Sequence, residues 1–151
     1  MLPFFFRLKK LDHVIRFNTI PALIRSQSVA EHSFQVAVLA LGVAVAESWE
    51  DAKVGQLLAK CLLHDLEEVE VSDIPHCVKH HDSSGSREFR EFLKKLSEER
   101  MEMFLFSSLP ETCRRVFQHL TLNAKGGGDT GDLVSFCDMY ELLVHCLVEL
   151  S

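Results

Sequence analysis

Hydrophobic residues recur along most of this chain at the three- and four-residue spacing of amphipathic helices. Strict alternation of hydrophobic and polar residues, which indicates a half-buried strand, never extends beyond a few positions. The pattern therefore predicts an all-α fold of about five to six helices, over residues 8–20, 29–47, 52–66, 86–106, 108–123 and 132–150. Residues 67–75 are expected to form a short extended or turn segment.

Several helix ends are marked by residues that can satisfy the free backbone groups there. Ser28-Val29-Ala30-Glu31 fits the capping-box pattern, in which a Ser and a Glu three positions later bond to each other's backbone N–H. Ser108-Leu109-Pro110-Glu111 fits the same pattern. Asp51 can cap helix 52–66, and Pro21 is expected to end or bend the first helix. Because residues 29–47 are apolar on most faces, this helix is expected at the centre of the fold.

Length and composition indicate a globular protein. The chain has 151 residues, 47% hydrophobic and 25% charged, so residues 1–151 are expected to form one domain with a sizeable core. A net charge of −6 argues against a nucleic-acid partner. The apolar start of the chain stops at Arg7, too short for a secretion signal, and no apolar run is expected to reach membrane-spanning length. No membrane association is therefore expected.

The five cysteines form no C-x-x-C pair, and most of them lie within apolar or helical patterns. Free cysteine at such positions behaves as a small hydrophobic residue. An odd number of unpaired cysteines fits a reducing compartment, so a cytoplasmic location is expected.

The chemically informative residues are His32, the pair His64-Asp65, and Asp138, each in its own predicted amphipathic stretch. His64-Asp65 falls at the end of a helix, where the helix dipole disfavours an aspartate unless a cation compensates. Asp138 is surrounded by apolar residues, where an unpaired carboxylate is costly. Two imidazoles and two carboxylates suit one divalent transition metal, and an ion with an open position generates a hydroxide nucleophile at neutral pH. Each residue alone also has an ordinary structural explanation, but together they indicate a metal-dependent hydrolase.

The segments around these residues resemble those of the YfbR-like 5′-deoxynucleotidases, which are HD-domain phosphohydrolases. The resemblance rests on Arg16-Phe17, Ser28-Val29-Ala30-Glu31-His32-Ser33, Leu63-His64-Asp65-Leu66-Glu67-Glu68 and Ser72-Asp73-Ile74-Pro75. It extends over about residues 8–147, nearly the whole chain. It implies an all-α HD-domain bundle that holds one divalent ion, such as Co²⁺, Mn²⁺ or Zn²⁺.

The resemblance also assigns a role to each matching residue. The metal ligands correspond to His32, His64, Asp65 and Asp138. The catalytic carboxylates correspond to Glu68 and Asp73, and the phosphate-binding arginine corresponds to Arg16. Phe17 stands at a base-stacking position that is usually Trp in the family, so it keeps the stacking face but lacks the indole N–H.

The activity implied by the resemblance is removal of phosphate from (deoxy)nucleoside 5′-monophosphates by a metal-activated water. A nucleotide is then the substrate partner, and a homodimer is implied as well. Arg16 is the only cation that the resemblance places at the phosphate, whereas a triphosphate brings about two more negative charges into a carboxylate-rich pocket. Monophosphates are therefore expected to be the better substrates.

Other interpretations stay open at this stage. The same scaffold supports a nucleoside triphosphate triphosphohydrolase, a catalytically idle nucleotide-binding module or, more distantly, a two-iron oxygenase. Glu68 also fits a solvated acidic run, Asp73 a turn, and Arg16 a surface cation. His80-His81 and His119 are the remaining metal-ligand types, and they are expected to be solvated rather than to bind a second metal.

Overall fold

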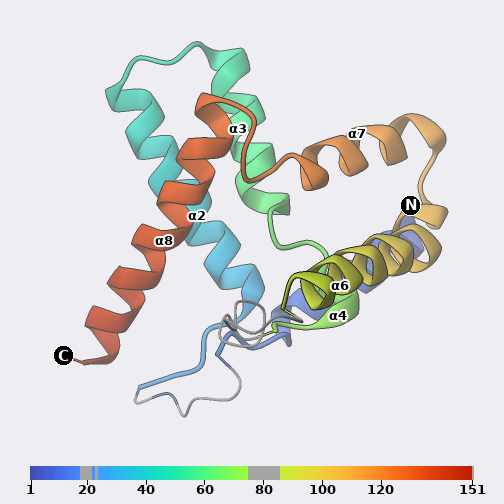
Figure 1. Ribbon diagram of the computed structural model, residues 1–151. Coiled ribbons are helices and arrows are strands. Elements are labelled where there is room, and N and C mark those ends of the chain that lie inside the picture. The colour runs from blue at the N-terminus through green and yellow to red at the C-terminus, as the bar shows by residue number, and fades with distance from the viewer. Residues whose placement is uncertain (18–21, 23, 75–85, 151) are drawn as a thin grey trace.

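Helices form most of the described chain, as the hydrophobic pattern predicts. The computed structural model describes residues 1–17, 22, 24–74 and 86–150. Its helices are α1 (Leu2–Leu8), α2 (Val29–Ala46), α3 (Asp51–Leu63), α4 (Glu68–Val71), α6 (Ser86–Arg100), α7 (Glu111–Leu122) and α8 (Asp129–Glu149) (Figure 1). Shorter helical turns are η1 (Lys9–Asp12), the π-helical η2 (Met101–Leu105) and η3 (Phe106–Ser108). Within the described residues, β pairing is limited to one isolated bridge, between Ile15 and Ser28, and the all-α expectation is confirmed.

The helices form two groups (Figure 1). The first group contains α2, α3 and α8, which pack against one another. The second contains α1, η1, α4, α6, η2 and η3, and α7 contacts both α3 and η3. The chain passes between the groups at the start of α2 and again at the end of α3. His32 and His64 lie at these two crossing points.

Helix α2 begins at a complete capping box, as expected, and packs against both α3 and α8. It is less central than expected, because Phe34, Val38 and Val45 are exposed on its outer face. The Glu31 N–H donates to the Ser28 hydroxyl over 3.2 Å, and the Ser28 N–H donates to the Glu31 carboxylate over 2.9 Å. Alanines at positions 37, 40 and 44 are buried, which lets α3 and α8 approach closely. The 18-residue helix α2 is long enough and apolar enough to cross a membrane, contrary to the expectation, but helices that pack in protein cores can have the same length and composition.

The N-terminal segment differs from its prediction, and the helix expected over residues 8–20 is wrong. The helical residues are instead 2–12, in α1 and η1, and Ile15 is extended beside Ser28. Pro3 lies in the first turn of α1, where its missing N–H has no intrahelical partner to lose. Phe4 then points into the core with 2% of its surface exposed. The apolar start of the chain therefore contributes Phe4 to the core, whereas Phe5 and Phe6 are exposed. Residues 18–20 and Pro21 lie outside the described residues.

Three local expectations also need correction. The segment expected to be extended after residue 67 contains one helical turn, α4, which ends at Ser72 with a φ of 65°. No second capping box forms before α7, because the Ser108 hydroxyl donates to the Leu105 carbonyl over 3.0 Å, and Pro110 occupies the cap position. Asp51 lies in the first turn of α3 instead of capping it.

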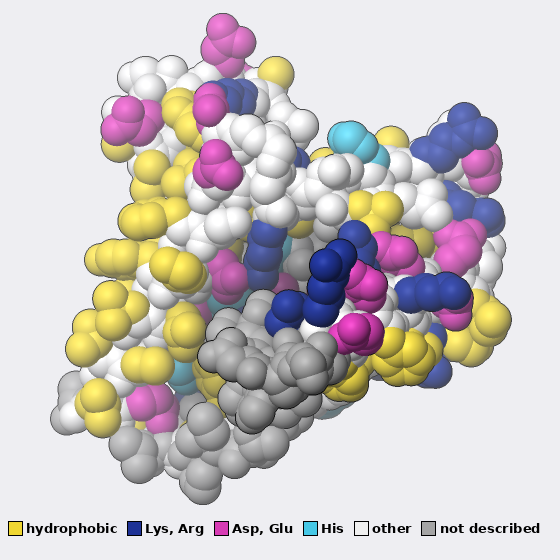
Figure 2. All heavy atoms as spheres, viewed as in Figure 1, with side chains coloured by type: hydrophobic (Ala, Val, Ile, Leu, Met, Phe, Trp, Pro, Cys, Tyr) yellow, Lys and Arg dark blue, Asp and Glu magenta, His cyan; other side chains and the backbone are white. Residues whose placement is uncertain are grey.

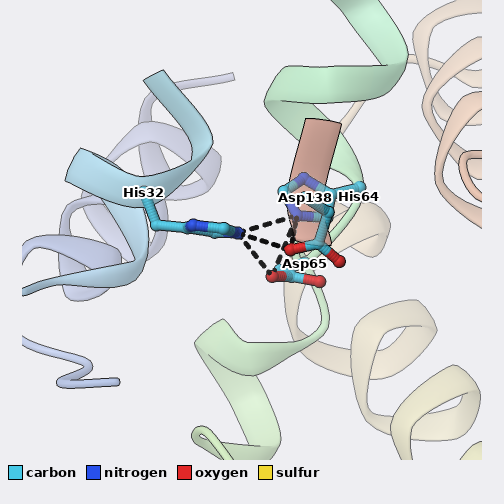
Figure 3. A group of neighbouring side chains, drawn as sticks. All are labelled: His32, His64, Asp65 and Asp138. Atoms are coloured by element: carbon cyan, nitrogen blue, oxygen red, sulfur yellow. Dashed lines mark hydrogen bonds and ion pairs between the residues drawn. The ribbon is translucent and has the colours of Figure 1, made fainter. Parts of the chain in front are cut away.

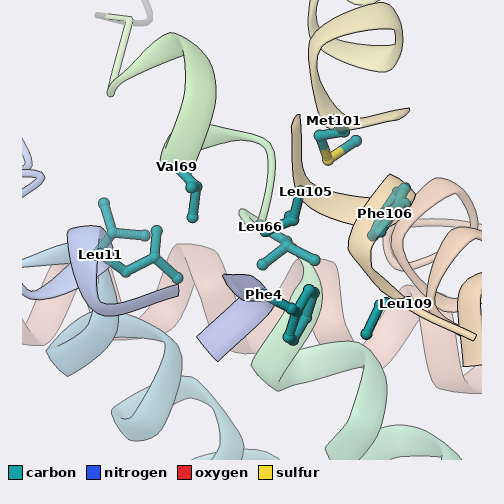
Figure 4. Close-up of a cluster of buried hydrophobic side chains, with 9 residues drawn as sticks. Phe4, Leu11, Leu66, Val69, Met101, Leu105, Phe106 and Leu109 are labelled. Carbon is teal, nitrogen blue, oxygen red and sulfur yellow. The ribbon is translucent and has the colours of Figure 1, made fainter. Parts of the chain in front are cut away.

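Two clusters of buried hydrophobic side chains stabilise the two helix groups. The first core cluster contains Phe4, Leu11, Val29, Leu66, Val69, Met101, Leu105, Phe106 and Leu109 (Figure 4). The second core cluster contains Val36, Ala37, Ala40, Ala44, Leu57, Cys61, Val134 and Cys137. Burying one large aliphatic or aromatic side chain contributes about 1.5–3 kcal/mol to the free energy of folding, so both clusters stabilise the packing of their helices. The His64-Asp65 pair lies between Cys61 of the second cluster and Leu66 of the first, at the seam between them.

Candidate active site

Four polar side chains converge at this seam (Figure 3). His32 comes from the first turn of α2, His64 and Asp65 follow α3, and Asp138 lies on α8. His32 Nε2 lies 3.0 Å from Asp138 Oδ1 and 3.2 Å from His64 Nε2, and His64 Nε2 lies 3.1 Å from Asp65 Oδ2. One ligand atom from each residue falls within 4.8 Å of those of the other three, so this cluster could hold a metal ion. The structure thus brings together all four ligands that the sequence suggested.

A hydrogen bond from its second ring nitrogen orients each histidine. His64 Nδ1 lies 2.7 Å from the Cys61 carbonyl oxygen, and His32 Nδ1 lies 2.5 Å from Glu141 Oε2. A carbonyl and an ionised carboxylate can only accept, so both Nδ1 atoms carry a proton and donate it. Both Nε2 atoms are therefore left to face the cluster, the arrangement in which an imidazole binds a metal.

Two cations lie against the carboxylates of the cluster. Lys125 Nζ lies 3.1 Å from Asp65 Oδ1 and 2.7 Å from Asp138 Oδ2, and Arg16 Nη1 lies 3.2 Å from Asp65 Oδ2. The sequence led us to expect Arg16 near the site but gave no indication of Lys125.

The turn between α7 and α8 brings Lys125 to the cluster. Residues 126–128 are three glycines with φ between 80° and 116°, values that side chains rarely adopt. A Cβ at Gly131 would lie 2.2 Å from the carbonyl oxygen of Gly126, so only glycine lets the turn fold against the start of α8. The glycine run is thus a defined turn that holds Lys125 over the site.

The charges of the cluster shift the pKa values of its members. Burial opposes a charged imidazole at His64, but hydrogen bonds to Asp138 and Asp65 outweigh it and raise the pKa to about 9. Burial also opposes the charged carboxylates, yet hydrogen bonds from the histidines and the charge of Lys125 hold the pKa values of Asp65 and Asp138 far below their usual range. The two carboxylates in turn raise the pKa of Lys125 against the effect of burial. Both candidate carboxylate ligands are thus ionised at neutral pH.

Arg16, Phe17 and Asp73 meet beside the cluster. Phe17 has a φ of 54°, an uncommon value for a residue with a side chain, and its N–H donates to Asp73 Oδ2 over 2.9 Å. The Arg16 guanidinium carbon lies 5.2 Å from the centre of the Phe17 ring. The Phe17 ring also stacks on His145, with 6.3 Å between ring centres. Strained backbone of this kind is often retained at functional sites, and here it lets Arg16 face Asp65 while Phe17 remains beside it.

Glu68 is the first residue of α4 and is buried, with 4% of its surface exposed. Helix α3 ends at Leu63, so Glu68 reaches its position through a turn, in which its N–H donates to the Asp65 carbonyl over 3.1 Å. Its burial contradicts the alternative of a solvated acid in an acidic run. The role implied by the family resemblance stays a prediction.

Some residues stand apart from the site, and others were missed. His119 lies on α7 beside Asn123, away from the four-residue cluster, and His80-His81 lie outside the described residues.

Glu141 and Gln27 were not anticipated from the sequence, although the three-residue spacing of Asp138 and Glu141 places both on one face of a helix. No spacing in the sequence pointed to Lys125, because this residue approaches Asp65 and Asp138 only through the glycine turn.

Comparison with known proteins agrees with the geometry. The family model 5′-deoxynucleotidase YfbR-like matches residues 3–151. The 5′-deoxynucleotidase YfbR of Escherichia coli is 26% identical over 151 residues, which cover 98% of this chain and 73% of the relative. That of Photorhabdus temperata is 25% identical over 154 residues, covering 100% of this chain and 75% of the relative.

Solved structures show the same likeness. An HD-domain phosphohydrolase from Listeria innocua has a TM-score of 0.76 at 26% identity, covering 97% of this chain and 68% of that one. A cyanophage S-2L HD phosphohydrolase, described as bound to dA and one catalytic Zn²⁺ ion, shares the fold with a TM-score of 0.51 at 19% identity, covering 96% of this chain and 90% of that one. From the family match, the relatives and the converging His and Asp residues together, we conclude that this chain belongs to the YfbR-like 5′-deoxynucleotidase family and is an HD-domain phosphohydrolase.

Proposed function

We propose that this chain removes the phosphate from deoxynucleoside 5′-monophosphates with one divalent metal ion held by His32, His64, Asp65 and Asp138. The observation that carries the proposal is the convergence of their four ligand atoms within 4.8 Å. The relatives named 5′-deoxynucleotidase and the cyanophage structure with dA and Zn²⁺ support the substrate class. Imidazole and carboxylate ligands suit Co²⁺, Mn²⁺, Zn²⁺ or a similar ion. When bound, such an ion supplies a water of lowered pKa and a Lewis acid for a phosphoryl oxygen.

Arg16 and Phe17 are proposed to bind the nucleotide. Arg16 already faces Asp65, so its guanidinium is placed beside the ligand set, where it can donate charge-assisted hydrogen bonds to the phosphate. Phe17 presents an aromatic ring next to Arg16 and can stack on a base or sugar. Stacking requires only a flat partner, so discrimination among bases is expected to be modest.

Glu68 and Asp73 are proposed to orient the attacking water and to protonate the departing 5′ oxygen. The burial of Glu68 next to the His64-Asp65 turn suits a group that moves a proton in a site shielded from bulk water. Asp73 accepts a hydrogen bond from the Phe17 N–H, which ties it to the segment that carries Arg16. Both carboxylates are therefore attached to the parts of the chain that would hold the substrate.

Monophosphates are proposed as the better substrates. Among the described residues, the Arg and Lys side chains in contact with the four-residue cluster are Arg16 and Lys125, and both already neutralise Asp65. A triphosphate adds about two more negative charges to a site that contains several carboxylates, and those charges would be poorly screened there.

A homodimer is also proposed, formed through an exposed hydrophobic face of α8. Phe136, Tyr140, Leu143 and Leu147 repeat at helical spacing and are 45–58% exposed (Figure 2). Contiguous hydrophobic surface of this kind usually marks an interaction site. We expect Leu143→Glu to shift the protein from dimer to monomer in light scattering, and a wild-type monomer would contradict the dimer.

We propose further that the protein works in the cytoplasm as one domain over residues 1–151, without nucleic-acid or membrane partners. The four described cysteines, at positions 61, 113, 137 and 146, are free thiols, which suits a reducing compartment. The net charge of −6 disfavours nucleic acid. Helix α2 packs against α3 and α8, as a core helix does.

A phosphate-release screen tests the enzymatic proposal. Mono- and triphosphates of the same deoxynucleoside are compared with several divalent metals, with Asp138→Ala as the inactive control. We expect release of inorganic phosphate and a higher kcat/KM for the monophosphate. A preference of about tenfold or more (~1.4 kcal/mol) for the triphosphate, with inorganic triphosphate as product, would identify a triphosphohydrolase instead.

A further inference from the structure

We propose that Glu141 is a positioning residue for the metal site, because it holds His32 in the ring orientation and tautomer that direct Nε2 toward His64, Asp65 and Asp138. The proposal rests on the function proposed above, in which His32 is a metal ligand. Glu141 is not one of the four candidate ligands, and it acts on the metal site through His32.

Glu141 links Gln27 to His32 in a buried hydrogen-bond relay. Its Oε2 accepts a hydrogen bond from His32 Nδ1 over 2.5 Å, and its Oε1 accepts one from Gln27 Nε2 over 2.6 Å. The exposed surface is 0% for His32, 3% for Gln27 and 5% for Glu141, so water cannot readily replace either bond. Each carboxylate oxygen thus has its own partner, and the carboxylate is fixed before it acts on the imidazole.

The relay matters because the two histidines are held differently. The partner of His64 is the carbonyl oxygen of Cys61, which lies three residues earlier in the last turn of α3. The partner of His32 is a side chain on another helix, so its orientation depends on how α2 and α8 pack. Asp138 and Glu141 are three residues apart on α8, so one helix supplies a candidate ligand and the support for a second.

Loss of this acceptor has a defined chemical consequence. A neutral imidazole can carry its proton on either nitrogen, and only a bare Nε2 can bind a metal in this arrangement. Glu141 favours the proton on Nδ1, because that proton then forms a charge-assisted hydrogen bond. Without the acceptor, His32 can place its proton on Nε2 or rotate its ring, and either change removes a ligand.

The test compares Glu141→Leu and Glu141→Gln with Glu149→Leu and Glu149→Gln. Glu149 is a matched control, because it lies on the same helix and accepts hydrogen bonds from backbone N–H groups of Ile24 and Arg25 instead of from a histidine. Metal affinity is measured for each variant by competition with a chelator, and thermal unfolding verifies the fold. The His32 Nδ1–H is followed by ¹⁵N-resolved NMR of the imidazole groups.

We expect Glu141→Leu to weaken metal binding about 10–100-fold and to eliminate the His32 Nδ1–H signal seen in the wild type, since removal of such outer partners typically has an effect of this size. Glu141→Gln, which keeps an acceptor, should weaken binding less and retain the signal. Both Glu149 variants should bind metal as the wild type does. If Glu141→Leu does not fold, Glu141→Gln must still weaken binding relative to Glu149→Gln.

Two results overturn the proposal, and a third concerns the function itself. Unchanged metal affinity in folded Glu141 variants would show that the relay does not support the site. Equal losses in the Glu141 and Glu149 variants would assign the effect to the stability of α8. A wild-type protein that binds no metal would instead contradict the proposed function, so the two failures are distinguishable.

Discussion

The four candidate metal ligands are placed by helices, whereas Arg16, Phe17 and Asp73 lie on irregular segments. His32 and Asp138 lie within α2 and α8, and His64 directly follows α3. In contrast, Phe17 has a positive φ, and Asp73 follows Ser72, which also has one. Helices packed through the second core cluster hold ligand atoms at fixed separations, and irregular segments can place a backbone N–H or a ring where no helix would. The ligand part and the substrate part of the site should therefore be separable by mutation.

The two parts also differ in the residues that restrain them. The ligand part is restrained by Cys61, Glu141 and Lys125 in addition to its own ion pairs. The substrate part is restrained by the Phe17–Asp73 hydrogen bond and the Arg16–Asp65 ion pair. The Arg16 backbone N–H also donates to the Gln27 carbonyl over 2.9 Å, and Phe17 stacks on His145. Substitutions in the ligand part should therefore remove the metal, whereas those in the substrate part should leave it bound.

The largest effect is expected from the ligand part itself. Asp138→Ala and His64→Ala should each eliminate both bound metal and turnover, because each removes one of the four converging ligand atoms. Metal content by mass spectrometry and phosphate release measure the two losses, with Phe17→Leu as a control that should retain its metal. Full metal stoichiometry in both ligand variants would refute the assignment.

Glu68 lies at the boundary between the two parts, and its substitution should separate binding from catalysis. Glu68→Ala should keep the metal and bind substrate, yet lose roughly 10²–10⁴-fold in kcat, the usual contribution of a general acid or base. Single-turnover kinetics with metal analysis of the same sample measure both. A kcat equal to that of the wild type would show that Glu68 has only a structural role.

A smaller loss is expected in the substrate part. Arg16→Ala should lower kcat/KM for a monophosphate about 10–100-fold, because hydrogen bonds to a charged group contribute about 1.5–3 kcal/mol. Metal content should not fall, since Arg16 is not one of the four candidate ligands. Arg25→Ala is the matched control, because Arg25 is exposed and pairs with Glu31 of the capping box. A similar loss in both variants would argue against a role at the phosphate.

The last test uses pH instead of a substitution to probe the ligand part. Burial lowers the pKa of the His64 imidazole, but hydrogen bonds to Asp138 and Asp65 raise it to about 9, so at neutral pH it carries a proton that a metal must displace. Metal affinity should therefore rise as pH increases, about tenfold per unit between about pH 7 and 9, and then level off. Titration calorimetry in buffers of different ionisation enthalpy should also detect about one released proton. An affinity independent of pH in this window would show that no proton with a pKa near 9 is displaced from His64 when the metal binds.

The sequence predicted the local backbone structure of the ligand part better than that of the substrate part, for a physical reason. Helices leave a periodic hydrophobic pattern and capping residues, so α2 and its capping box could be located from the chain alone. A positive φ at Phe17 or Ser72 leaves no such pattern, because neither residue is glycine. The predicted helix over residues 8–20 failed for a related reason: periodicity alone does not reveal that the chain becomes extended at Ile15 to pair with Ser28.

By itself, the sequence determined the helical class, the start of α2 at its capping box and the His and Asp residues capable of binding a metal. Only the tertiary structure brought Glu141 to His32 across 109 positions and Lys125 to Asp65 across 60. Local spacing controls which residues share a helix face, since backbone hydrogen bonds and side-chain periodicity act over a few residues. Contacts between distant residues depend on how the two core clusters pack and on the turn that three glycines allow.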